Sequence, residues 1–276
     1  MEEMKTHAVR EFHKNQDEAD CQAEEIRNIG YAVVESGLSA AELQLIRQKI
    51  DDIYEVQVRE IGGTDALNRI NDADLVRCII GYDDYFLTLA THPLIMAITR
   101  KLLGENFILM SQNAIINRPV AGHYQFTWHR DLNYQHYVSS RPLAISALYA
   151  IDDFTKETGG TWLIPASHKC EPFPSLAYVR RHGKQMSAPA GSILLFDAMV
   201  YHRAGVNRSG RLRRSVNHIY CVPMIQQQIS LPSMLGGKFS DDPFLRMFLG
   251  YDTETGLSVQ QWRTRKLAQA ERLVKA

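Results

Sequence analysis

The sequence has no excess of charge of either sign, because 31 lysine and arginine residues balance 31 aspartate and glutamate residues. A general electrostatic attraction to nucleic acid or to an acidic membrane surface is therefore not expected. No stretch approaches the roughly 18 uninterrupted apolar residues of a membrane span, and residues 1–7 lack the apolar core of a signal peptide. We expect a cytoplasmic protein whose partner is a small molecule, with neither nucleic acid nor a membrane.

Cysteine is also scarce. Cys21, Cys78, Cys170 and Cys221 are scattered along the chain and form no Cys-x-x-Cys pair. This spacing excludes a zinc knuckle and a thioredoxin-like motif, and four reduced thiols are the simplest interpretation.

Secondary-structure signals change in character near residue 105. Before it, residues 17–28 and a segment from Pro93 to Gly104 are helix-prone, residues 31–35 resemble a strand, and Ser39-Ala40-Ala41-Glu42 is a capping box that begins a long helix. Its apolar stripe consists of Leu43, Ile46, Ile50, Ile53 and Tyr54.

From residue 107 to residue 222 the chain offers short, apolar, β-branched runs separated by glycine and proline. This pattern predicts an all-β core with flanking helices, a cupin-like double-stranded β-helix or jelly roll braced by N-terminal helices. Residues 259–275 are expected to form a basic surface helix. At this length, residues 1–276 are expected to form a single domain.

A short motif suggests a metal site. Side chains two positions apart on a strand point the same way, so His129 and Asp131 in Trp128-His129-Arg130-Asp131 can reach one cation. His202, on a later expected strand, would complete the site. Two imidazoles and one carboxylate on one face of an octahedron leave positions open for an oxidant and O₂ on non-haem Fe(II). The alternative is a hydrogen-bonded Trp-His-Asp cluster at a strand end.

A basic strand follows His202. Period two places Arg213 and Ser215 on one side of it, where a guanidinium and a hydroxyl can bind the distal carboxylate of 2-oxoglutarate. Arg214 would face the other way, toward solvent. The alternative is an exposed basic patch for phosphate or nucleic acid, which the zero net charge disfavours.

With these residues, the sequence resembles the phytanoyl-CoA dioxygenase-like family of Fe(II)- and 2-oxoglutarate-dependent oxygenases. The resemblance is strongest between residues 107 and 222. Four blocks occur in the order typical of the family: Trp128 to Asp131, Thr158-Gly159-Gly160-Thr161-Trp162-Leu163-Ile164-Pro165-Ala166-Ser167-His168, Gly191 to Phe196, and His202 through Asn207 to Arg213.

The resemblance implies a role for each matching residue. His129, Asp131 and His202 would be the metal ligands, and Arg213 with Ser215 would anchor 2-oxoglutarate. Gln112 matches a position that often contacts this co-substrate. Because Asp131 fills the position that related halogenases leave open for chloride, hydroxylation is favoured over halogenation. The implied reaction consumes O₂ and 2-oxoglutarate and releases succinate and CO₂.

Two other functions remain open at this stage. A cupin-like hydrolase or isomerase could use the same ligands around Zn²⁺ or Mn²⁺ without O₂, although Arg213 and Ser215 would then have no assigned role. A jelly-roll binding protein could keep the metal site without turning anything over. The motifs also do not distinguish among an acyl thioester, an amino acid, a sugar and a specialised metabolite as the ligand.

Several residues are assigned by position alone. Asn133 and Tyr134 follow the motif and are expected to line the substrate pocket, and Trp162 is a candidate wall of the iron site. A basic cluster between the second and third blocks could be a lid for an anionic substrate or an exposed loop, and three further histidines are expected to be structural. The cluster includes Arg180, Arg181 and Lys184, and the histidines are His123, His168 and His218.

Overall fold

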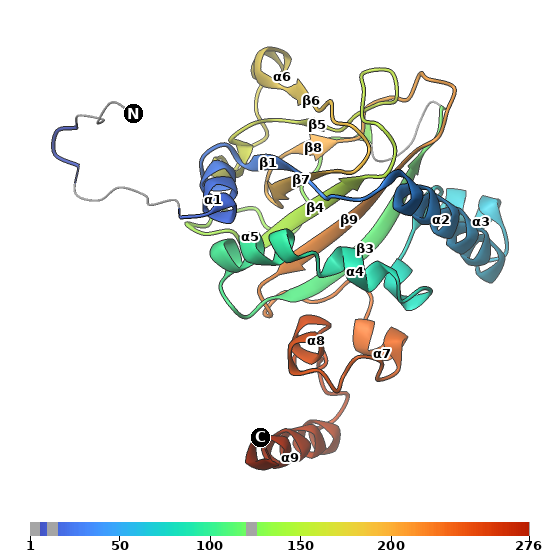
Figure 1. Cartoon of the computed structure of the whole chain (residues 1–276), viewed down its shortest axis with the longest axis vertical. Coiled ribbons are helices and arrows are strands. Elements are labelled where there is room, and N and C mark those ends of the chain that lie inside the picture. The colour runs from blue at the N-terminus through green and yellow to red at the C-terminus, as the bar shows by residue number, and fades with distance from the viewer. Residues whose placement is uncertain (1–5, 10–15, 120–125, 276) are drawn as a thin grey trace.

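The computed structural model describes residues 6–9, 16–119 and 126–275. Its centre is a six-stranded antiparallel sheet in the order β1-β7-β4-β9-β3-β2, accompanied by a three-stranded sheet in the order β6-β5-β8 (Figure 1). The strands are β1 (Tyr31–Glu35), β2 (Leu75–Val76), β3 (Ile108–Asn117), β4 (Ala144–Ala150), β5 (Trp162–Leu163), β6 (Lys184–Gln185), β7 (Ser192–Asp197), β8 (His202–Arg203) and β9 (Arg213–Cys221).

Helices cover one face of the larger sheet and extend from one of its ends (Figure 1). Those of the N-terminal half are α1 (Glu18–Ile29), α2 (Ala40–Glu60), α3 (Thr64–Arg69), the 3₁₀ helix η1 (Ile79–Gly81), α4 (Phe86–Ala90) and α5 (Pro93–Leu103). Later come the 3₁₀ helix η3 (Ser167–Lys169), α6 (Leu176–His182), α7 (Leu231–Leu235), α8 (Pro243–Phe248) and α9 (Val259–Lys275).

The expected N-terminal helices form, and their local signals are visible. The Ser39 hydroxyl accepts a hydrogen bond from the Glu42 N–H at 3.3 Å, while the Glu42 carboxylate accepts one from the Ser39 N–H at 2.8 Å. Four residues of the predicted apolar stripe of α2 are buried, and Tyr54 packs against them. The capping box and the stripe are thus confirmed.

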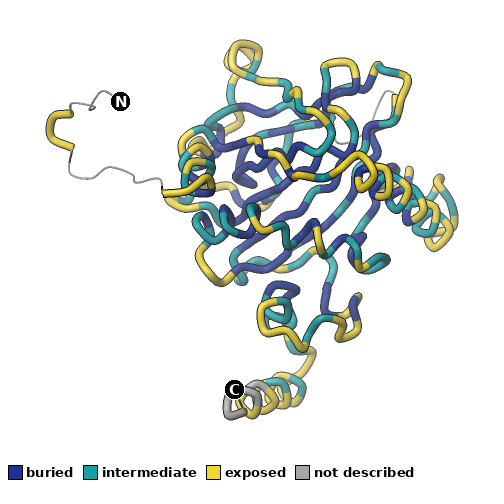
Figure 2. Tube along the Cα trace, in the orientation of Figure 1, coloured by how far each residue is buried: buried dark blue, intermediate teal, exposed yellow. Residues whose placement is uncertain are grey.

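The larger sheet is covered on both faces. All seven residues of β4 are buried, as expected for a strand packed between two layers. One face packs against the helices in the main apolar core, and the other faces the three-stranded sheet. Figure 2 shows the central strands as largely buried.

This arrangement confirms the expected all-β jelly-roll core with flanking helices. The single-domain expectation stays a prediction. No helix among the described residues combines the length and apolarity needed to cross a membrane.

Candidate functional site

Backbone hydrogen bonds hold the motif segment against the start of β8. His129 and His202 form an antiparallel bridge in which each N–H donates to the other residue's carbonyl at 3.0 Å. The Asp131 N–H donates to the Ala198 carbonyl, also at 3.0 Å. Because these bonds involve only backbone atoms, the fold itself brings the three side chains to one place.

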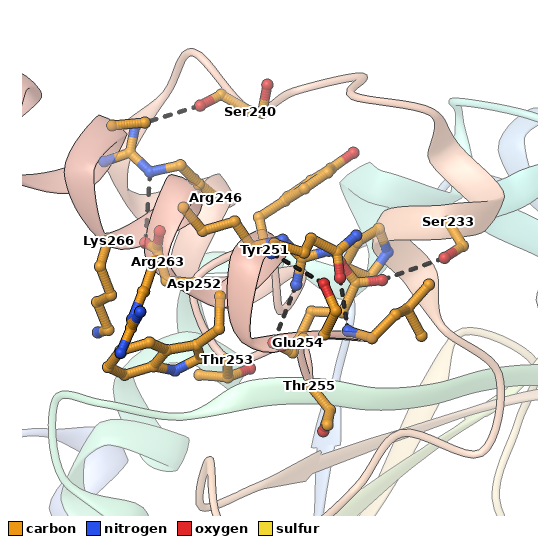
Figure 3. Close-up of a pocket in the computed structure, with 18 of the residues that line it drawn as sticks. Ser233, Ser240, Arg246, Tyr251, Asp252, Thr253, Glu254, Thr255, Arg263 and Lys266 are labelled. Atoms are coloured by element: carbon orange, nitrogen blue, oxygen red, sulfur yellow. Dashed lines mark hydrogen bonds and ion pairs between the residues drawn. The ribbon is translucent and has the colours of Figure 1, made fainter.

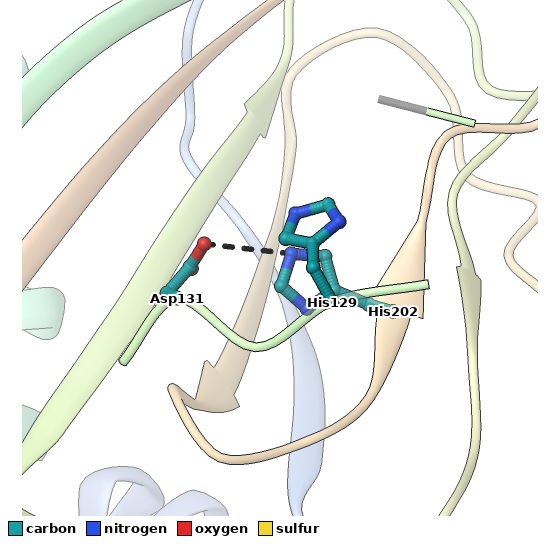
Figure 4. Close-up of side chains that lie close together, drawn as sticks. All are labelled: His129, Asp131 and His202. Carbon is teal, nitrogen blue, oxygen red and sulfur yellow. Dashed lines mark ion pairs between the residues drawn. The ribbon is translucent and has the colours of Figure 1, made fainter. Parts of the chain in front are cut away.

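The three side chains point toward a common centre (Figure 4). One ligand atom of each residue lies within 4.8 Å of the other two, and His202 Nε2 is 3.6 Å from Asp131 Oδ1. Nitrogen and oxygen ligands about 2.1 Å from one metal ion lie about 3 Å apart when adjacent. A small contraction of this triad, which we call the His129-Asp131-His202 triad, would therefore enclose a single ion.

Hydrogen bonds orient each ligand atom. His129 Nδ1 lies 2.8 Å from the Thr127 carbonyl and His202 Nδ1 lies 3.0 Å from the Val200 carbonyl. A carbonyl only accepts, so both Nδ1 atoms carry hydrogen and both Nε2 lone pairs are left for a metal. Burial lowers the pKa of His202 to about 4, which keeps its imidazole neutral near pH 7.

Asp131 is oriented in the same way. The Ser146 hydroxyl on β4 donates a hydrogen bond to its Oδ2. This leaves Oδ1 facing His202, so the donor set comprises two neutral imidazoles and one carboxylate oxygen. Such a set fits a divalent ion of the non-haem iron type.

Arg213 is fully buried, and no described residue forms an ion pair with it. Its side chain is 1% exposed, its Nε has no hydrogen-bond partner, and its guanidinium carbon lies 4.5 Å from the centre of the Phe154 ring. Within the described residues the guanidinium forms neither a hydrogen bond nor an ion pair. Burial lowers the pKa of Arg213 to about 10, so the group stays charged at neutral pH. A buried charge of this kind is costly unless an anion completes it.

A cavity of about 820 Å³ connects the triad with Arg213 and Ser215. Asn217 also lines this cavity, and so does Asn113, which lies directly opposite it on β3. The structure therefore brings together the five residues His129, Asp131, His202, Arg213 and Ser215. Their roles as metal ligands and co-substrate anchor stay predictions.

The position of Gln112 differs from the expected contact with 2-oxoglutarate. It faces the helical side of the sheet, where its amide nitrogen donates to the Phe86 carbonyl at 2.7 Å and lies 2.8 Å from His218 Nε2. The strand register shifts between Leu109 and Ser111, which is the signature of a β-bulge. The bulge reverses the alternation after Met110, so Gln112 cannot reach the cavity and the expected co-substrate contact is wrong.

Arg214 departs from expectation in a different way. It does face away from the cavity, but it is not directed to solvent. Its guanidinium forms ion pairs with Asp51 of α2 at 2.8 Å and with Asp152 at 3.2 Å, and Asp152 also binds Arg47. This network attaches α2 to the start of β9, beside Arg213.

The residues expected around the substrate divide into two groups. Asn133 and Tyr134 do line the cavity, and the Tyr134 side chain is 91% exposed at its mouth. Trp162 is not among the lining residues. It instead lies beside Arg203, whose guanidinium carbon is 5.7 Å from its ring centre and 5.2 Å from that of Trp128.

The basic cluster does not cover the cavity. Arg180 and Arg181 lie on α6 and Lys184 on β6, and none of them is among the residues that line it. Of the three histidines expected to be structural, His168 and His218 are buried and do not line the cavity. His123 lies outside the described residues. Burial lowers the pKa of His218 to about 3.

A second hollow, larger at about 1130 Å³, lies between α9 and the segment that carries α7 and α8 (Figure 3). Its acidic groups are already paired. Arg246 binds Asp252 at 3.3 Å, and Arg265 binds Glu254 at 2.6 Å. Size alone does not make it the functional site. In the described part of the chain, only the His129-Asp131-His202 triad forms a cluster of three or more potential metal ligands.

The double glycine of the second motif block has a packing reason. A side chain on Gly159 or Gly160 would collide with the backbone of Gly205 or Met186 respectively, so only glycine lets these segments approach. Asn207 then fixes the loop after β8 by donating to the Asn117 and Arg211 carbonyls at 2.8 and 2.6 Å.

Sequence reasoning missed three residues of the site, of which Asn217 and Asn113 line the cavity and Ser146 orients Asp131. Asn217 could have been found by continuing the two-residue count from Arg213 and Ser215 along β9. Ser146 was signalled only by a small hydroxyl within an apolar run. Asn113 had no usable signal, because the bulge in β3 hides which alternate residues face inward.

Comparisons with known proteins agree with this geometry. The sequence model of the family described as phytanoyl-CoA dioxygenase (PhyH) matches residues 26–215, well over half of the chain. An uncharacterized protein from Mycobacterium tuberculosis is 32% identical over 215 residues, covering 75% of this chain and 77% of its own length. The dioxygenase trt7 from Aspergillus terreus is 27% identical over 217 residues, 70% of each chain.

A solved structure supports the fold. The crystal structure of EctD from S. alaskensis with 2-oxoglutarate and 5-hydroxyectoine superposes with a TM-score of 0.62. The two are 18% identical, and the match covers 79% of this chain and 80% of EctD. At this identity the likeness concerns the jelly-roll fold alone.

Proposed function

The chain belongs to the phytanoyl-CoA dioxygenase family, and from this premise we propose that it hydroxylates an unactivated C–H bond of a small molecule, using Fe(II), 2-oxoglutarate and O₂. His129, Asp131 and His202 would hold the iron. Arg213 and Ser215 would bind the distal carboxylate of 2-oxoglutarate. Bound together, iron and 2-oxoglutarate supply the oxidising power: O₂ delivers one oxygen atom to the substrate as hydroxyl and the other to succinate, with loss of CO₂.

The residues of this chain contribute placement. Hydrogen bonds from the two Nδ1 atoms aim the imidazoles, and the Ser146 hydroxyl aims the carboxylate. The buried guanidinium of Arg213 would bind the distal carboxylate of 2-oxoglutarate, which would leave the keto acid end free to reach the triad. Holding reactants in a fixed geometry accounts for a large part of enzymatic rate enhancement.

The observation that carries the proposal is the buried Arg213, which no described residue pairs with and which lines the same cavity as the triad. A hydrolase or isomerase that uses Zn²⁺ or Mn²⁺ has no need for such a group, whereas a dicarboxylate co-substrate neutralises it. A binding protein that merely retains a metal would also leave it unexplained. As a metal ligand, the carboxylate of Asp131 would take the position that a halide needs in related halogenases, and for this reason we favour hydroxylation.

The test begins without oxygen. Fe(II) and 2-oxoglutarate added to the metal-free protein should together produce the visible absorption band of the iron-keto acid chelate, and neither should do so alone. Admission of O₂ should then release succinate. Absence of the band would overturn the co-substrate site, and a band without succinate release in the presence of candidate substrates would favour the binding protein.

A further inference from the structure

The cavity floor changes in chemical character along β9. Its inward-facing residues are Arg213, Ser215, Asn217 and Ile219, so one strand passes from a guanidinium through a hydroxyl and an amide to an aliphatic side chain. Successive inward residues of a strand are about 6.6 Å apart. Arg213 and Ile219, at the polar and apolar ends of the cavity, are therefore about 20 Å apart along the strand. One molecule of 2-oxoglutarate can span only part of this distance.

The triad stands at the boundary between these ends. Ser146, which binds Asp131, lies directly opposite Ile219, whereas Ser215 lies opposite Ala150. Four residues along β4 correspond to about 13 Å. In the proposed complex, 2-oxoglutarate bound by Arg213 and Ser215 would occupy this interval, which leaves the space beyond Ile219 for the substrate.

That remaining space has an apolar wall. Met110, Leu143 and Ile225 are partly buried and pack against a small cluster that includes Leu132 and Ile219. All five line the cavity. Apolar side chains that remain partly exposed on a concave surface mark a binding site for an apolar group.

The described residues that line the cavity offer no free carboxylate for a cationic substrate. Among the described lining residues Asp131 is the one acidic side chain, and it belongs to the triad. Arg77 at the mouth is paired with Asp72. Amide and hydroxyl groups of Asn133, Tyr134 and Gln226 complete the outer rim.

We infer that the substrate presents an uncharged hydrocarbon portion, an aliphatic chain or ring, to the metal, seated against Met110, Leu143, Ile219 and Ile225. This inference rests on the proposed function. The polar groups of the substrate point outward to the rim, and the cavity disfavours a positive charge near the reacting carbon. The cavity volume of about 820 Å³ lies in the range of sites for drug-sized ligands.

The test uses the anaerobic complex of the full chain with Fe(II) and 2-oxoglutarate. Butan-1-ol, hexan-1-ol, octan-1-ol and octylamine are titrated, and the change in the chelate absorption band gives each dissociation constant. Burial of each methylene group should tighten binding about fourfold along the alcohol series. Octylamine, which has the same chain but a positive charge, should bind at least about tenfold more weakly than octan-1-ol.

Two matched variants locate the binding surface. Ile225→Asn should weaken octan-1-ol binding about tenfold without changing the affinity for 2-oxoglutarate. Ile70→Asn, at an exposed isoleucine that does not line the cavity, should leave both unchanged.

The outcomes separate the two proposals. If the chelate band forms but binding is independent of chain length, or octylamine binds as tightly as octan-1-ol, the substrate inference is wrong and the proposed function stands. If the chelate band does not form, the proposed function fails and the inference falls with it.

Discussion

Replacing Arg213 by alanine is expected to weaken 2-oxoglutarate binding by about a hundredfold to several thousandfold. The guanidinium is 1% exposed and has no counter-ion among the described residues, so the co-substrate would supply its only charge partner there. Breaking a buried charge pair costs on the order of 3–5 kcal/mol, and each 1.4 kcal/mol is about tenfold in affinity. The lowering of its pKa from 12.5 to about 10 corresponds to a burial cost of about 3 kcal/mol, in the same range.

The assay is an anaerobic titration of the Fe(II)-loaded protein with 2-oxoglutarate, followed by the chelate absorption band. Arg211→Ala is the matched control, because Arg211 is an exposed arginine two residues earlier. Arg213→Lys keeps the charge but not the two parallel hydrogen bonds, so its affinity should be intermediate. A loss of affinity below about threefold in Arg213→Ala would remove this residue from the co-substrate site.

Thermal stability provides an independent measurement. In the absence of ligand, Arg213→Ala loses a buried charge without a partner, so its free energy of unfolding should not fall as far as for an ordinary core truncation. With Fe(II) present, 2-oxoglutarate at a hundred times its dissociation constant should stabilise the unaltered protein by about 2.7 kcal/mol. The same concentration should stabilise Arg213→Ala far less. Equal stabilisation of both proteins would refute the assignment.

Three further outcomes are expected. Asp131→Ala should abolish iron-dependent succinate formation measured by chromatography, and retained turnover would exclude a ligand role. Ser146→Ala should lower the affinity for Fe(II) roughly tenfold to a hundredfold in a competition titration with a chelator, because the carboxylate loses its orienting hydrogen bond; unchanged affinity would contradict this. Burial lowers the pKa of His218 to about 3, below its unfolded value of 6.5, so the unfolded state binds the proton first as the pH falls. Stability should therefore decrease below pH 6.5, by about 2 kcal/mol at pH 5, and urea denaturation of His218→Asn should show a weaker decrease.

The sequence predicts most strongly where a signal is local. The capping box at Ser39 and Glu42 and the strand at residues 31–35 depend on neighbouring residues alone, and both occur as expected. The alternation along β9 likewise places Arg213 and Ser215 on one face, because that strand has no irregularity in its pairing with β4.

Prediction fails where tertiary structure changes the local rule. A simple two-residue count along β3 from Ile108 places Gln112 with Met110 on the cavity side, but the bulge between Leu109 and Ser111 turns it to the helices. Arg214 was expected in solvent because a strand with one buried face usually exposes the other. The position of α2, which covers that face and supplies Asp51, depends on long-range packing that no short window contains.

The backbone bridge between His129 and His202 has a consequence for metal loading. In small zinc domains the ion must pull its ligands together, and its binding free energy is consumed in folding the chain. Here backbone hydrogen bonds already join the segments that carry His129 and His202, so the ligand site is preorganised before an ion binds. The protein stripped by a chelator should therefore keep its far-ultraviolet circular dichroism spectrum, and added Fe(II) should restore the site without a refolding delay.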